Sequence, residues 1–116
     1  MKFIINYWRN LSGKAPVEKY IDDIDNKEER AEILTALKGI QEYGTEAVGA
    51  EFRQLEGKLW ELKIRTHGSQ HRIFYIVMKG NEMILLHAYL KKTPRTPLKE
   101  IETATQRMKK LMEAKR

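Results

Sequence analysis

The residue types best suited to chemistry gather in one stretch, "LKIRTHGSQHRIFY" at 62–75, between two apolar runs typical of β-strands. Two such runs joined by a short turn predict a β-hairpin, in which Arg65 would face Arg72 and Lys63 would lie on the same side. Like charges facing each other destabilise a strand pair, and an anion bound between them would relieve the repulsion. Arginine's planar fork suits phosphate, so the pair predicts a phosphate site. The alternative is that Glu61, Lys63 and Arg65 form an ordinary solvated face.

A second basic group follows the strand expected at 82–92, in "YLKKTPRTP" at 89–97, and consists of Lys91, Lys92 and Arg95. If that strand neighbours the Arg72 strand, the group would reach the same end of the sheet. A basic loop ahead of a helix explains it equally well.

The histidines invite an acid–base interpretation because imidazole titrates near neutral pH. His67 falls in the expected turn, His71 opens the Arg72 strand, and His87 lies in an apolar strand where a hydrogen-bonded core histidine is the simpler explanation. Their spacing forms no zinc motif, and the chain has no cysteine, so no metal site is predicted.

The elements that must position these residues follow from periodicity and breakers. The expected elements are a buried strand at 2–8, a helix from Pro16, a helix opened by Asn26 and stopped near Gly44, strands at 52–55, 59–66, 71–78 and 82–92, and a helix over about 98–114. The order β-α-α-β-β-β-β-α, with short turns between the later strands, predicts an α+β fold with an antiparallel sheet, an N-terminal helical hairpin and a C-terminal helix.

Length and composition favour one globular domain over residues 1–116, because the chain can bury one modest core. No segment approaches the ~20 apolar residues of a membrane span, and the N-terminus is too short and polar for a signal peptide. A cytoplasmic protein without a membrane partner is expected.

The net charge of +6 is unevenly distributed along the sequence. Residues 1–57 carry eight Lys and Arg against eleven Asp and Glu, whereas residues 58–92 carry seven against two. A cationic surface built by one part of a fold is typical of a polyanion binder, although a generally solubilising surface is the alternative.

Three motifs make the sequence resemble the RelE/HigB superfamily of bacterial toxins, and most closely its phage-derived Gp49-like branch. They are "GKAPVEKYIDDI" after the first strand, "LEGKLWELKIRTHGSQHRIFYIV" in the middle and "ILLHAYLKKTPRTP" before the charged terminal helix. Their order and spacing cover nearly the whole chain.

The resemblance implies a RelE-like toxin domain of a type II toxin–antitoxin system. It implies an endoribonuclease that cuts mRNA, typically on the ribosome, without metal or cofactor. It also implies a cognate antitoxin from an adjacent gene, often with a helix-turn-helix. The related ParE toxins share the fold but bind DNA gyrase without cutting RNA, and a phage protein that binds nucleic acid without activity is a further alternative.

Carried over motif by motif, the resemblance gives Arg72 and Arg65 the role of stabilising the transition state. Lys91 and Lys92 would share that role or hold flanking RNA.

Three further residues, Lys63, Arg95 and His71, are expected to contact RNA. The tyrosine that some members carry near the C-terminus is missing from the terminal helix, so Tyr89 and His87 are the candidates for proton transfer.

Overall fold

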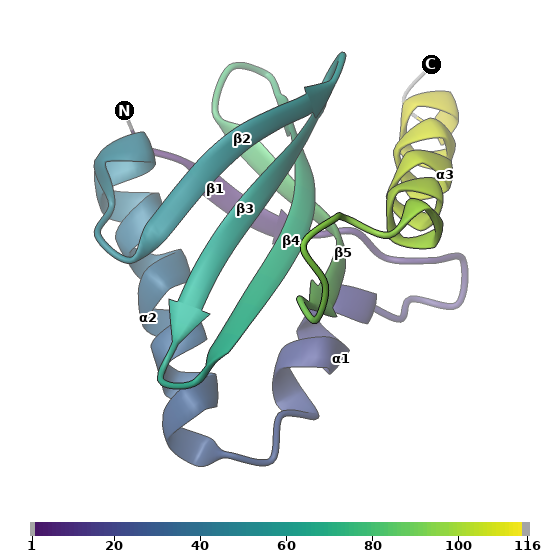
Figure 1. Cartoon of the computed structure of the whole chain (residues 1–116). Coiled ribbons are helices and arrows are strands. Elements are labelled where there is room, and N and C mark those ends of the chain that lie inside the picture. Colours follow the sequence, from purple (N-terminus) through teal and green to yellow (C-terminus); the bar gives the residue numbers. More distant parts are fainter. Residues whose placement is uncertain (1, 115–116) are drawn as a thin grey trace.

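The computed structural model describes residues 2–114 as a five-stranded sheet with helices on both faces (Figure 1). In chain order the elements are β1 (Ile4–Tyr7), α1 (Pro16–Asp22), α2 (Lys27–Tyr43), a 3-10 helix (Gly44–Glu46), β2 (Ala50–Glu56), β3 (Leu59–Thr66), β4 (Ser69–Met78), β5 (Glu82–Leu90) and α3 (Leu98–Ala114). The predicted α+β class and the predicted order of strands and α-helices are confirmed.

The expectation of a wholly antiparallel sheet is wrong at one edge. The strand order is β1-β5-β4-β3-β2, and β1 pairs with β5 in parallel, from Ile4 opposite Glu82 to Tyr7 opposite Leu85. Tight turns force β2 to β5 to alternate in direction, but β1 is connected to β2 through two helices, and such a crossover permits a parallel neighbour. The first strand is therefore an edge rather than a buried strand, and Ile4 is 56% exposed.

The predicted register of the β3–β4 hairpin is also wrong, by two residues. Lys63 is opposite Arg72, whereas Arg65 is opposite Gln70. The strands continue to the two-residue turn His67–Gly68, in which the φ of +92° at Gly68 suits glycine. A slip of two residues preserves the side of the sheet on which each residue lies, so Lys63, Arg65 and Arg72 still share one face.

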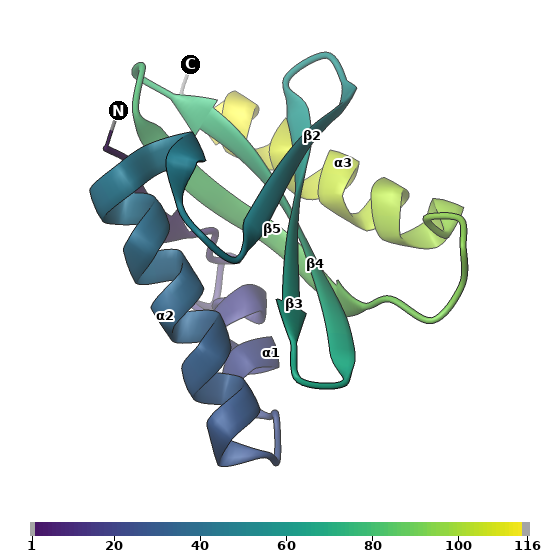
Figure 2. The same cartoon turned by 60° about the vertical axis from the view of Figure 1, so that its left-hand side comes forward.

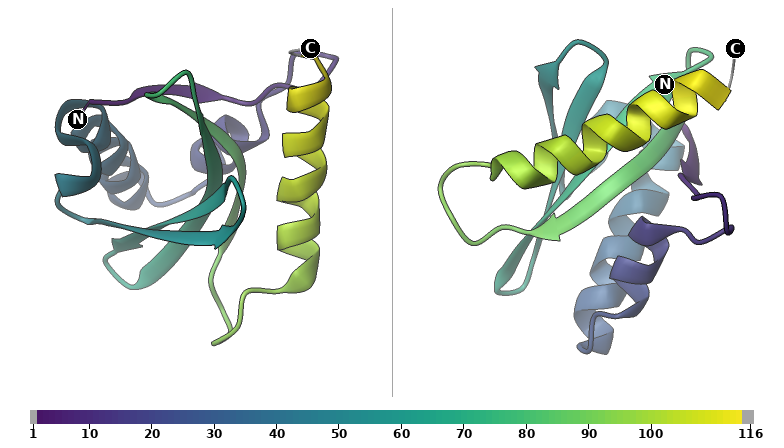
Figure 3. Two further views of the ribbon diagram at one scale, coloured as in Figure 1. Left: turned by 90° about the horizontal axis from the view of Figure 1, so that it is seen from above. Right: turned by 90° about the vertical axis from the view of Figure 1, so that its right-hand side faces the viewer.

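Two apolar cores lie on opposite faces of the sheet. The strands curve partly around α1 and α2, while α3 packs on the other face (Figure 3). Alternate residues of β4 serve the two cores: Ile73 and Tyr75 pack with α1 and α2, whereas Phe74 and Ile76 pack with α3. This division explains why β4, the middle strand, is apolar on both sides.

The ends of the helical hairpin follow local rules. The Asn26 side chain accepts a hydrogen bond from the backbone N–H of Glu29 at 2.9 Å, which confirms the predicted N-cap of α2. Gly44 ends the helix at a φ of +64°. Figure 2 shows α1 and α2 together on one side of the strands. Within residues 2–114, no helix is both long enough and apolar enough to span a membrane.

Candidate functional site

The α3 helix covers only part of its face of the sheet, and polar side chains occupy the remainder on β2, β3 and β4. In Figure 1, no helix crosses the front of these three strands. Five basic side chains lie there, and we call them the cationic face: Arg53, Lys63, Arg65, Arg72 and Lys91. Lys91 lies on this face because it follows Tyr89 by two residues, and alternate residues of an extended chain point to the same side.

A buried carboxylate lies at the centre of the cationic face. Glu61, only 2% exposed, accepts hydrogen bonds at Oε1 from Arg53 Nη2 and Arg72 Nη1, both at 3.0 Å. Its Oε2 accepts from the hydroxyls of Tyr89 at 3.3 Å and Thr96 at 3.4 Å. These donors compensate the cost of burying the charge, because a buried carboxylate is tolerated when it is paired and hydrogen-bonded.

Arg72 uses only part of its guanidinium in these contacts. Nη1 bonds Glu61, Nη2 makes a long 3.3 Å bond to Gln70 Oε1, and Nε is a buried nitrogen without a hydrogen-bond partner among the described residues. Unpaired buried donors are uncommon in folded proteins. Nε and Nη2 form one two-donor edge of an arginine, the geometry that binds carboxylate or phosphate through two parallel bonds. Within residues 2–114, no carboxylate bonds that edge.

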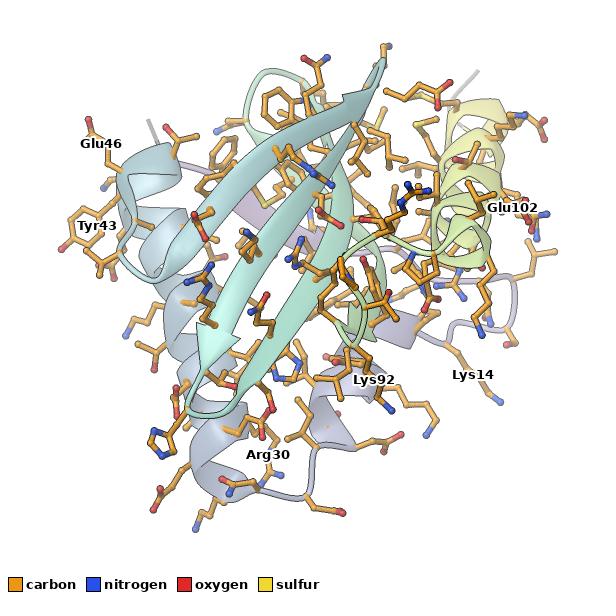
Figure 4. The ribbon with its side chains drawn as sticks, in the orientation of Figure 1. Lys14, Arg30, Tyr43, Glu46, Lys92 and Glu102 are labelled. Atoms are coloured by element: carbon orange, nitrogen blue, oxygen red, sulfur yellow. The ribbon has the colours of Figure 1, made fainter. Side chains whose placement is uncertain are left out.

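An open cleft of about 800 Å³ lies at the same end of the hairpin. Five residues named so far contribute to its lining: Arg65, Gln70, Arg72, Lys91 and Lys92. Figure 4 shows Lys92 beyond the end of β5, on the loop that leads to α3. The structure therefore brings together four of the predicted basic residues, namely Arg65, Arg72, Lys91 and Lys92.

Lys91 combines a fixed backbone with a perturbed amine. The backbone N–H of Lys91 donates to the carbonyl of Gln70 at 2.9 Å, which anchors the start of the loop against β4. Partial burial lowers the pKa of Lys91, and the nearby positive charge of Arg72 lowers it further. A larger neutral fraction than that of an ordinary lysine makes proton transfer at this amine more accessible.

Lys63 and Arg65 are less constrained. The Lys63 amine lies 3.7 Å and the Arg65 Nε 4.0 Å from the same oxygen of Glu51. Arg65 is exposed, and long surface ion pairs of this kind contribute little to stability. Both side chains are therefore free to exchange this carboxylate for another anion.

Tyr89 reaches the cationic face but is already engaged. It is 6% exposed and its hydroxyl donates to Glu61. Burial raises the pKa of Tyr89, and the Glu61 charge opposes its ionisation as well. Its hydroxyl therefore holds the carboxylate rather than acting as a free base.

Three of the predicted site residues do not line the cleft: His71, His87 and Arg95. His71 is 2% exposed and faces α1 and α2, where its Nδ1 lies 2.7 Å from the Tyr20 hydroxyl and its Nε2 lies 2.6 Å from Glu29. Arg95 is exposed on the loop and does not line the cleft.

His87 belongs to the packing of α3. Its Nε2 lies 2.8 Å from Glu100 Oε1, and its Nδ1 lies 3.2 Å from Arg107 Nη1. Burial lowers the pKa of His87, so the ring is biased toward its neutral form. This placement agrees with the simpler explanation given for His87 from the sequence, a hydrogen-bonded core histidine.

Sequence reasoning missed the residues that organise the site. The sequence pattern places Glu61 on a solvated face and indicates no role for Arg53 or Thr96. One sequence signal for this role is that Glu61 is the single acidic residue of "LWELKIR" and lies on the same side of the strand as Lys63. Among the described residues, no three His, Cys, Asp or Glu side chains gather in a way that could hold a metal ion.

The fold and the site define a small α+β protein with a cationic face built around one buried carboxylate. The chain belongs to the family described as Phage derived protein Gp49-like (DUF891), whose family model matches residues 19–109. This family is RelE/toxin-like, and the match confirms the Gp49-like part of the resemblance. A search of curated proteins found no match.

Proposed function

We propose that this protein is the toxin of a type II toxin–antitoxin system and that it inhibits translation by cutting mRNA, on the ribosome. The observation that carries the proposal is the two-donor edge of Arg72, which no carboxylate among residues 2–114 holds, at a cleft that Arg65, Lys91 and Lys92 also line. Membership of the Gp49-like family supports the same assignment.

The proposed reaction is attack by a ribose 2′-oxygen on the adjacent phosphate. The 2′-hydroxyl gives up its proton, its oxygen bonds to phosphorus, and the bond from phosphorus to the 5′-oxygen breaks. The departing oxygen takes a proton, which leaves a 2′,3′-cyclic phosphate and a 5′-hydroxyl. Negative charge builds on the two non-bridging oxygens during this step, and the Nε and Nη2 donors of Arg72 are spaced to bind them.

The other cations have separate roles in this proposal. Lys91, whose pKa is lowered by burial, accepts the 2′-hydroxyl proton in its neutral form. Arg65 and Lys92, both exposed at the cleft, hold the phosphates on either side of the cut. Lys63 contributes positive potential from the neighbouring strand.

The proposed partners are the ribosome, mRNA and an antitoxin encoded by an adjacent gene. An acidic or amphipathic antitoxin segment laid over the cationic face would exclude RNA both sterically and electrostatically. The antitoxin and RNA should therefore compete for Lys91 and Lys92.

The test is to induce the wild-type protein and Arg72→Lys in cells, follow growth and map new mRNA 5′ ends. Arg72→Lys retains a cation for Glu61 but lacks the two-donor edge. Arg72→Ala is less informative, because Arg72 is 7% exposed and its removal deprives a buried carboxylate of a partner, which destabilises proteins by about 3–5 kcal/mol.

The proposal expects growth arrest with new 5′ ends for the wild type. It expects neither for Arg72→Lys, since loss of one transition-state donor lowers rates about 10²–10³-fold. Growth arrest without new 5′ ends, accompanied by DNA breaks, would instead identify a gyrase-directed toxin.

A further inference from the structure

We infer that Glu61 is the positioning residue of the site: its carboxylate holds Arg72 by Nη1 and so turns the Nε–Nη2 edge toward the substrate phosphate. This inference rests on the proposed function, but its structural part can be measured without RNA cleavage. Glu61 carries the wrong charge to bind RNA, and both of its buried oxygens already accept hydrogen bonds from protein donors, so its contribution to the reaction acts through those neighbours.

The first argument is convergence. Four chain segments reach the one carboxylate: Arg53 from β2, Arg72 from β4, Tyr89 from β5 and Thr96 from the loop before α3. Each segment also carries or adjoins a residue of the cationic face. The position of Glu61 therefore fixes the relative positions of groups that are distant in the sequence.

The second argument is the division of donors on Arg72. A carboxylate binding Nε and Nη2 together would occupy the edge that phosphate needs. Glu61 instead bonds Nη1, on the other side of the guanidinium, at 3.0 Å. A neutral amide, Gln70, makes the 3.3 Å contact at Nη2, and Nε has no hydrogen-bond partner within residues 2–114. Phosphate can displace a neutral amide without competing against a buried charge.

The third argument is electrostatic. Glu61 offsets part of the repulsion between Arg53 and Arg72, which it bonds through the same oxygen. Without its charge the face would be more positive, so its attraction for RNA would increase while Arg72 lost its orientation. A positioning role thus predicts that binding and catalysis change in opposite directions.

The first experiment compares Glu61→Gln with the wild type. Single-turnover cleavage of ribosome-bound mRNA gives the rate of the chemical step, and the dissociation constant is measured with an oligonucleotide that carries a 2′-deoxy sugar at the cut. We expect the rate to fall about 10²-fold, the scale of a misplaced catalytic group. We expect RNA affinity to stay equal or increase. Weaker RNA binding in a folded variant would overturn the inference.

The second experiment observes Arg72 directly. In ¹⁵N NMR of the full chain, the Nε–H signal of Arg72, assigned by its loss in Arg72→Lys, should shift when inorganic phosphate is added. Glu61→Gln should abolish this shift. The matched control is Glu51→Gln, which removes one carboxylate from the same face but none that contacts Arg72, and it should keep the shift. A retained shift in Glu61→Gln would overturn the inference.

Glu61→Asp covers the case in which Glu61→Gln does not fold. It keeps the charge for both arginines but withdraws the oxygens by one methylene, so the rate should fall while RNA affinity stays unchanged. An unchanged rate in this variant would contradict positioning. If the wild type cuts no RNA while the phosphate response depends on Glu61 and not on Glu51, the positioning stands and the proposed ribonuclease function fails.

Discussion

At the scale of single residues, two basic side chains differ in what their environment allows. Arg72 is buried, held on one side, and always charged, so it suits fixed stabilisation of negative charge. Lys91 is partly exposed, and its pKa is lowered by burial and by Arg72, so it suits proton transfer. This division assigns the two tasks of phosphodiester cleavage to neighbouring groups.

The proposed role of Lys91 predicts a pH dependence. The neutral amine is the active form, so the cleavage rate should rise with pH and level off above the pKa of Lys91, which lies below the ordinary 10.5. Lys91→Arg keeps the charge but cannot act as a base. We expect its cleavage rate to be about 10²–10⁴-fold lower and to show no increase with pH. Single-turnover rates measured in parallel on both proteins test this, and the same pH profile in the variant would refute it.

At the scale of elements, a partly buried hydrogen-bonded chain attaches the helical hairpin to β4. Tyr20 on α1 and Glu29 on α2 bond the two ring nitrogens of His71. A carboxylate can only accept, so His71 donates from Nε2 to Glu29, and the Tyr20 hydroxyl can serve Nδ1 as donor or acceptor. Burial raises the pKa of Tyr20 to about 12, whereas the bond to His71 lowers the pKa of Glu29.

Glu29→Gln should therefore lower the free energy of unfolding near pH 7, by about 1–2 kcal/mol for a partly exposed charged hydrogen bond. A lowered carboxyl pKa stabilises the fold above the unfolded value of 4.5, and this contribution is lost as pH falls through the folded value. The difference between the two proteins should thus shrink below about pH 4.5.

Urea denaturation at several pH values measures this difference. Glu28→Gln is the matched control, because it removes the same charge from the first turn of α2 without removing the bond to His71. Equal losses in the two variants would attribute the effect to the helix terminus instead.

The elements were more predictable from sequence than their pairing. The bounds of β3 and α3 follow from periodicity within one segment, and the structure has them as expected. The parallel pairing of β1 depends on how two helices cross the sheet, and no local pattern contains that information. The hairpin register depended on whether Ser69 and Gln70 extend the strand, a choice settled by the turn at Gly68.

The site was predicted by residue type but not by contact. Arg72 and Lys91 stand out because cations interrupt apolar strands. The role of Glu61 could not be found in this way, because its four partners lie on three other strands and a loop, and only the folded sheet brings them together.

At the scale of the whole molecule, charge is separated between layers. The segment with α1 and α2 carries the acidic excess, and the later strands and loop carry the basic one. A long polyanion is therefore attracted to the α3 face and repelled from the helical hairpin.

Salt dependence tests this orientation. Lys92→Gln should lower the slope of log affinity against log salt by about 0.7, the contribution of one phosphate contact to single-stranded nucleic acid. Lys38→Gln, which removes an exposed lysine from α2 on the opposite face, should leave the slope unchanged. RNA anisotropy titrations at several salt concentrations provide the slopes, and equal slopes for the two variants would mean that RNA binds elsewhere.

The most direct test of the central claim uses purified protein and ribosome-bound mRNA with a single 2′-deoxy sugar at the cleaved position. The attacking group we propose is the 2′-oxygen, so the unmodified mRNA should be cut at that position to leave a 5′-hydroxyl on the downstream fragment. The deoxy mRNA should remain intact there under the same conditions. Cleavage of both RNAs at that position, or a 5′-phosphate on the downstream fragment, would contradict the mechanism.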